Sequence, residues 1–91
     1  MSGDRRMIVV MPLEWYRFGN IYSGSIGDFR YRFEPSKDKE TVKASRYTVY
    51  AYSEADDIEE TVFELSEEGL EQARDWLFSK YEEYVERKEQ V

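Results

Sequence analysis

The longest regular pattern of apolar and polar positions runs from Leu65 to Lys88 and has the repeat of an amphipathic helix. Ser66 is a favourable N-cap, and Leu65 and Leu70 occupy the two positions of a hydrophobic staple. Gly69, in the first turn, costs about 1 kcal/mol relative to alanine. The apolar side chains of the helix share one face: Leu70, Ala73, Leu77, Tyr81, Tyr84 and Val85, flanked by Trp76 and Phe78. This wide apolar arc predicts a helix that lies across a sheet.

The clearest strand pattern is the strict alternation between Asp28 and Glu34. Its apolar positions are Phe29, Tyr31 and Phe33. Such an alternation predicts a strand with one buried and one solvent-exposed face. The exposed face is basic at its centre, because Arg30 and Arg32 lie there.

Three further stretches have the composition of strands: Trp15–Tyr22, Thr41–Ser53 and Ile58–Leu65. The strand predicted over Trp15–Tyr22 has a kink at Gly19-Asn20. In the last strand, Thr61, Phe63 and Leu65 face inward. For the first of them, a helical turn over Pro12 to Phe18 that ends at Gly19 is the alternative. Glycine, proline and polar residues predict turns at Ser23–Gly27, Pro35–Glu40 and Glu54–Asp57.

No single register fits the stretch from Thr41 to Ser53. A β-bulge near Ser45-Arg46 would resolve the conflict by turning Tyr47, Val49 and Ala51 toward the core. Tyr50 and Tyr52 would then face outward beside Arg30 and Arg32, where arginine can stack on an aromatic ring.

The order of elements is therefore four strands followed by one helix, with short connections. It predicts an α+β fold in which a C-terminal helix packs on one face of an antiparallel meander of three or four strands. A chain of 91 residues makes one small domain, residues 1–91. Residues 1–12 are expected to be a flexible tail or to contain a short edge strand at Met7–Met11.

The chain contains no cysteine and no histidine. This composition excludes disulfides, zinc sites built on those residues, thiol nucleophiles and an imidazole base. Nothing in the sequence places carboxylate pairs such as Asp57 with Glu59, or Glu60 with Glu64, together in a cleft where they could act as acid and base. The acidic run at 54–60 lacks the spacing of a calcium loop. We therefore expect no enzymatic activity, no metal and no cofactor.

Charge is distributed unevenly along the chain, whose formal net charge is −7. Residues 1–53 carry 9 basic and 6 acidic side chains (net +3), whereas residues 54–91 carry 4 basic and 14 acidic ones (net −10). A negative domain repels nucleic-acid phosphates, so direct binding to nucleic acid is disfavoured. Because no apolar run is long enough to span a membrane, a cytoplasmic location is expected.

The acidic residues predict an interaction surface for a protein with a basic surface. It consists of a turn and a helix stripe: Glu54, Asp56, Asp57, Glu59 and Glu60, and Glu71, Asp75, Glu82, Glu86 and Glu89. Residues four apart on a helix are about 6 Å apart along its axis, similar to the spacing of phosphates along a DNA strand. The hypothesis is an inhibitor that mimics DNA and acts on a nucleic-acid-handling protein, as anti-restriction or anti-CRISPR proteins do.

Three alternatives remain at this stage. The acidic stripe can be a solvated surface that aids solubility. The outward face of the sheet, with Arg30, Arg32, Tyr50 and Tyr52, has the residue types that bind single-stranded nucleic acid. The protein can also associate with itself through Trp76 or Phe78.

Overall fold

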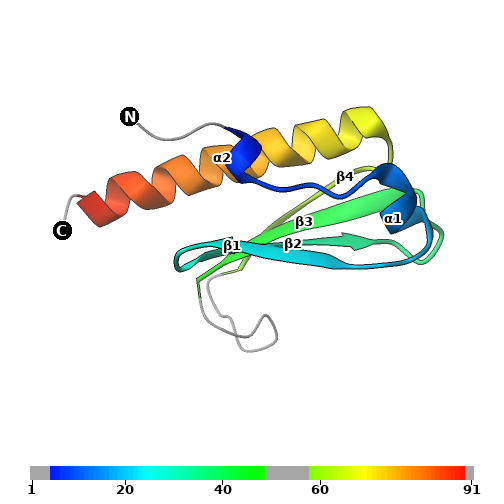
Figure 1. The fold of residues 1–91 in the computed structure, drawn as a ribbon, viewed down its shortest axis with the longest axis horizontal. Helices are drawn as coiled ribbons and strands as arrows, with labels where there is room; N and C mark the ends of the chain where they lie inside the picture. The colour runs from blue at the N-terminus through cyan, green and yellow to red at the C-terminus, as the bar shows by residue number, and fades with distance from the viewer. Residues whose placement is uncertain (1–4, 49–57, 90–91) are drawn as a thin grey trace.

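The computed structural model describes residues 5–48 and 58–89, the last two by their backbone only. Its sheet has four antiparallel strands in the order β1-β2-β3-β4 (Figure 1). The strands are β1 (Tyr22–Ile26), β2 (Phe29–Pro35), β3 (Thr41–Tyr47) and β4 (Glu59–Glu64), and helix α2 (Glu67–Glu89) lies along one face. The predicted α+β meander with its C-terminal helix is confirmed.

The face of the sheet that α2 covers, called the inner face, carries Phe29, Tyr31 and Phe33, all buried. Leu70, Ala73 and Leu77 of α2 belong to the same buried cluster. The ring of Phe29 lies 5.4 Å from that of Tyr81, between centroids. The alternation predicted for β2 and the apolar arc predicted for α2 therefore meet in one core.

The start of α2 is fixed as predicted. The Gly69 N–H donates to Ser66 Oγ over 3.0 Å, which makes Ser66 the N-cap. Leu65 and Leu70, at the staple positions, are 5% and 4% exposed. A Cβ atom at position 69 would overlap the carbonyl oxygen of Glu64, so this glycine lets the helix start against the end of β4.

The N-terminal segment is neither an edge strand nor a loose tail over residues 5–12. Arg5–Met7 form a 3-10 turn (η1), and the residues that follow lie outside the sheet. Ile8 is fully buried in the core. Its carbonyl accepts a bond from Arg74 Nε over 3.1 Å, and the Val9 N–H donates to Tyr31 Oη over 3.0 Å. These side chains satisfy backbone groups that a strand neighbour would otherwise bind.

The stretch from Trp15 to Tyr22 contains no strand residue except Tyr22, where β1 begins, and the helical alternative is confirmed. Helix α1 comprises Leu13–Arg17, and Gly19 follows it with a φ of 87°. The Gly19 N–H donates to the Tyr16 carbonyl over 2.8 Å, a C-terminal arrangement that favours glycine. Tyr16, fully buried, anchors this short helix in the core.

The turn expected over Ser23–Gly27 is a strand instead. Ser23 to Ile26 belong to β1, and only Gly27 lies in a turn, at Gly27-Asp28, between the paired residues Ile26 and Phe29. Gly24 lies opposite Tyr31, whose ring occupies the space that a Cβ atom of residue 24 would need. This glycine therefore serves packing within the strand.

The bulge predicted near Ser45-Arg46 is wrong. Pairing between β2 and β3 is continuous, with Tyr31 opposite Arg46 and Arg30 opposite Tyr47. Arg46 therefore lies on the inner face, 5.6 Å from the Phe29 ring centroid. Tyr47 lies on the opposite face, called the open face because no helix of the described residues covers it, although Tyr47 itself is only 5% exposed. The stacking on Phe29 and a salt bridge to Glu59 replace the apolar contact expected there.

Other predictions for this region have mixed outcomes. Thr61 and Phe63 face inward and Leu65 is buried, as expected for the last strand. The loop expected at Pro35–Glu40 is present as the connection between β2 and β3. The positions predicted for Val49, Tyr50, Ala51, Tyr52 and the turn at Glu54–Asp57 fall outside the described residues.

Candidate functional site

The outward surface of α2 is strongly acidic. Over residues 67–87 the exposed residues are Glu67, Glu68, Glu71, Gln72, Asp75, Ser79, Glu83, Glu86 and Arg87. Six of these nine are carboxylates and one is a cation. At 1.5 Å per residue, they extend over about 30 Å of helix. We call the six carboxylates the acidic face.

The other two cations of this part of α2 lie at the flanks of the acidic face, where each contacts one of its carboxylates, Glu71 or Glu83. The side chain of Arg74, 19% exposed, reaches the Ile8 carbonyl and Glu71. The side chain of Lys80, 21% exposed, donates to Glu59 over 3.0 Å and lies 5.8 Å from the Trp76 ring centroid. Their charges stay mainly at the flanks of the helix, beside the sheet and the N-terminal segment.

One end of the acidic face already holds a guanidinium group. Arg5 Nη2 lies 2.6 Å from Glu71 Oε1, and Arg5 Nη1 lies 3.2 Å from Asp75 Oδ1. The hydrogen bond from Arg5 lowers the pKa of Glu71 below its ordinary value. The two carboxylates repel each other in an isolated helix, but here one arginine bridges them.

The structure brings together part of the predicted helix stripe. Glu71, Asp75 and Glu86 are exposed, whereas Glu82 is half-buried. The side chain of Glu89 lies outside the described residues. Glu67, Glu68 and Glu83 also belong to the acidic face, although the predicted stripe did not include them. The helical repeat contains the signal for Glu68 and Glu83, because it places both away from the apolar arc, whereas Glu67 lies in the first turn of the helix.

The acidic turn does not join the acidic face as far as it is described. Glu59 and Glu60 lie on opposite faces of β4. Glu59 contacts Arg46 over 3.4 Å as well as Lys80, and Glu60 contacts Lys43 over 3.5 Å and the Ser45 hydroxyl over 3.1 Å. Both carboxylates thus bind neighbouring elements. Glu54, Asp56 and Asp57 lie outside the described residues.

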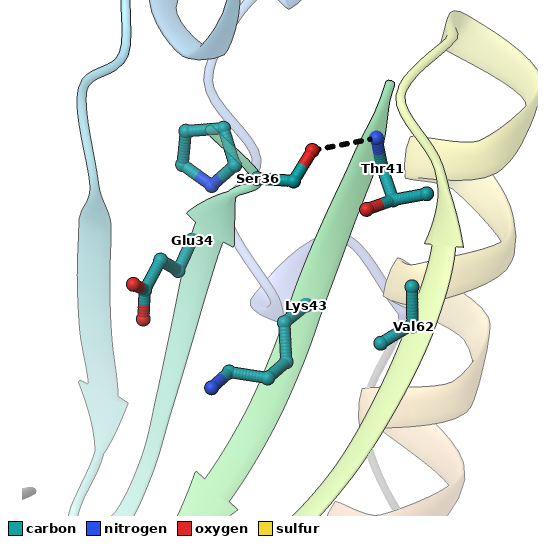
Figure 2. A pocket seen from close by; sticks show the side chains of 6 residues that line it. Glu34, Ser36, Thr41, Lys43 and Val62 are labelled. Carbon is teal, nitrogen blue, oxygen red and sulfur yellow. Dashed lines mark hydrogen bonds between the residues drawn. The ribbon is translucent and has the colours of Figure 1, made fainter. Parts of the chain in front are cut away.

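The open face of the sheet carries both signs of charge. Arg30 and Arg32 lie on it, as predicted for the alternative site, while Tyr50 and Tyr52 are outside the described residues. Arg32 is 2.9 Å from Glu34. A shallow depression of about 240 Å³ lies there. Figure 2 shows Lys43, which lines it, between Glu34 and Val62 on the neighbouring strands. A phosphate backbone would meet carboxylates on this face as well as cations.

Residues 5–48 and 58–89 contain no group of three or more acidic side chains placed to hold a metal ion. The clearest pKa shift belongs to Tyr16. Burial of its hydroxyl raises the pKa to about 12, although a hydrogen bond from the Met11 N–H opposes the change. This hydroxyl supports the N-terminal segment within the core.

Comparisons with protein families, with curated proteins and with solved structures found no significant match to this chain. Within the described residues, neither η1, α1 nor α2 has the length and apolar character that a helix needs to cross a bilayer.

Proposed function

We propose that this protein is a non-enzymatic binding module whose acidic face docks on a basic surface of another protein. The observation that carries the proposal is the composition of the exposed side of α2, six carboxylates against one cation. Arg74 and Lys80 neutralise this surface only in part, because each contacts one of its carboxylates and also binds a group beside the helix.

The contact between Arg5 and the Glu71–Asp75 pair supports arginine as the partner side chain that the acidic face binds. Planar guanidinium groups bind carboxylates through two parallel bonds, and proteins that grip DNA or RNA expose them in rows. A long acidic helix can occupy such a groove in place of a phosphate backbone. The proposed partner is therefore a nucleic-acid-handling protein, which the acidic face would inhibit as a decoy.

Net charge supports the same proposal through its effect on association. A molecule with a formal charge of −7 is attracted toward a basic groove before contact, which raises the association rate at low ionic strength. The affinity of such a complex is expected to fall as salt concentration rises.

The test compares two triple variants that remove the same charge from different surfaces. Asp75→Asn, Glu83→Gln and Glu86→Gln alter the acidic face, whereas Glu14→Gln, Glu40→Gln and Glu64→Gln alter exposed positions elsewhere. Each variant and the wild type serve as bait in host lysate, and captured proteins are identified by mass spectrometry.

We expect the wild type and the second variant to capture the same basic, nucleic-acid-binding protein, and the acidic-face variant to bind it roughly ten-fold more weakly. The captured protein, once purified, should lose labelled DNA or RNA when the wild type is added. Equal capture by both triple variants would contradict a role for the acidic face. Simultaneous binding of the nucleic acid and this protein would contradict the decoy mechanism.

A further inference from the structure

The two edges of the sheet differ in how they are protected. β4 carries Glu59, Glu60 and Glu64, and charged residues on an edge strand hinder pairing with another chain. β1, at the other edge beside β2, has no such residue, and no charged residue occurs anywhere from Phe18 to Gly27. This uncharged edge is a surface on which a further strand can add.

The backbone groups available on β1 follow from its turn. The two-residue turn at Gly27-Asp28 makes Ile26 and Phe29 the first bonded pair, and bonding alternates along an antiparallel ladder. Ser23 and Ser25 therefore direct their N–H and C=O groups away from β2. Both serines are exposed.

Exposed apolar side chains lie next to this edge. Ile21 immediately precedes β1 and is 43% exposed, and Phe18, at the C-terminal end of α1, is 82% exposed. Val9 is also 43% exposed, and its N–H bonds to the Tyr31 hydroxyl, which lies over Gly24. The apolar surface thus continues from β1 to the N-terminal segment that contains Val9.

We propose that β1 pairs with β1 of a second copy of this chain, antiparallel and about a two-fold axis at Gly24. In this register Ser23 of one copy lies opposite Ser25 of the other, so that the outward backbone groups of both strands meet. On the inner face, the half-buried Tyr22 lies opposite Ile26 of the second copy, an aromatic–aliphatic pair that stabilises sheets. The two four-stranded sheets become one sheet of eight strands.

The distribution of charge favours β1 over β4 as the sheet edge at which a second copy can pair. Each copy carries a formal charge of −7, so most approaches between copies are repulsive. Along β1 no charged side chains face each other, and the next strand inward carries Arg30 and Arg32. Helix α2 packs mainly on β3 and β4, which puts the acidic faces at the two far ends of the joined sheet.

A five-residue edge with a few apolar neighbours buries less area than the 1,200 Å² or more of most stable complexes. The dimer is therefore weak and concentration-dependent. Sedimentation velocity of the wild type from about 10 μM to about 1 mM should show a shift from monomer to dimer.

Paired substitutions on β1 test the register. Ser23→Glu with Ser25→Glu sets like charges opposite each other across the axis, and this variant should remain monomeric. Ser23→Lys with Ser25→Glu sets opposite charges in the same places and should dimerise at least as well as the wild type. Gln72→Glu with Ser79→Glu, on exposed positions of α2, adds the same two charges away from the edge and should leave the dimer intact.

Thermal unfolding by circular dichroism checks that every variant keeps the fold, since all the altered side chains are exposed. A wild type that stays monomeric throughout this range would overturn the proposal. So would a Ser23→Glu, Ser25→Glu variant that dimerises like the wild type, because the contact would then lie elsewhere, for example at Trp76 or Phe78.

Discussion

Gly69 stands where the first turn of α2 meets the end of β4. Helix propensity alone counts this glycine as a cost. In the folded chain, however, a Cβ atom at this position would overlap the Glu64 carbonyl oxygen. Ser66 caps the helix two residues after β4 ends, so the strand backbone passes close to the first turn. The close contact with the strand backbone, and not helix propensity, therefore explains why position 69 requires glycine.

Replacing Gly69 by alanine tests this interpretation. We expect Gly69→Ala to lower the free energy of unfolding by about 1–3 kcal/mol, because the helix must shift away from β4. Urea denaturation measures the change. Gln72→Ala, at an exposed position of the same helix, should stay within about 0.5 kcal/mol of the wild type. A Gly69→Ala protein that is more stable than the wild type would show that propensity dominates.

Tyr16 makes the stability of the folded protein depend on pH in the alkaline range. Burial raises the pKa of its hydroxyl from 10.0 to about 12, because the charged form loses its hydration. The raised value means that the folded state favours the neutral form. This contribution to stability is complete below pH 10.0 and is lost as the pH rises toward about 12.

Stability should therefore fall by about 2–3 kcal/mol between these two pH values on account of this residue. Urea denaturation of the wild type at several pH values measures the fall. Tyr16→Phe is less stable at neutral pH, since the Met11 N–H loses its acceptor. Its stability should decline less over the alkaline range. An equal decline in stability in both proteins would assign the effect to other groups. Tyr31 is one such group, because burial also raises its pKa.

At the level of elements, the N-terminal segment is part of the core. Ile8 is buried in the same cluster as residues of α2 and the sheet; its carbonyl accepts a bond from Arg74, and the next N–H, of Val9, donates to Tyr31. The sequence Met7 to Met11 has the apolar character of a strand but contributes none to the sheet. Side-chain partners contributed by distant residues decide this outcome.

Shortening the side chain of Ile8 measures the contribution of this segment. Ile8→Ala should lower the free energy of unfolding by about 2–4 kcal/mol, because it leaves a cavity in the core. Val9→Ala, at the adjacent and 43% exposed position, is the matched control and should cost well under about 1 kcal/mol. Similar small losses for both variants in chemical denaturation would mean that the segment is only loosely attached.

At the scale of the whole molecule, the two sides of the α2–sheet sandwich differ in charge. The exposed side of α2 is acidic, whereas the open face of the sheet alternates cations with carboxylates, as in the contacts Arg32–Glu34 and Lys43–Glu60. These contacts occupy cations that a nucleic acid would require. The net charge of −7 adds long-range repulsion of phosphates.

Labelled single-stranded DNA should therefore not be retarded by the wild-type protein in a mobility-shift assay at low salt, even at high protein concentration. The double variant Glu34→Gln, Glu60→Gln removes the carboxylates that contact Arg32 and Lys43. It serves as the comparison in which weak binding of the DNA would be measurable. Retardation by the wild type that disappears in an Arg30→Ala, Arg32→Ala variant would instead establish the open face as a nucleic-acid site.

The sequence alone determined the parts of this protein that depend on local periodicity. The alternation of β2, the cap and staple of α2, its apolar arc and its excess of exposed carboxylates all follow from residues within one or two turns of each other. Together with the short connections they predict the meander covered by one helix. The same periodicity locates Glu71, Asp75 and Glu86 on the exposed side of α2.

Only the tertiary structure decided the features that depend on contacts between distant residues. The ring of Tyr31 occupies the space beside Gly24 in β1, Arg46 faces inward onto Phe29 without a bulge, and Arg5 bridges Glu71 and Asp75. Each involves partners that local patterns do not connect. Side-chain packing and charge pairing across the fold override weak local preferences, because their energies exceed the small differences among local conformations.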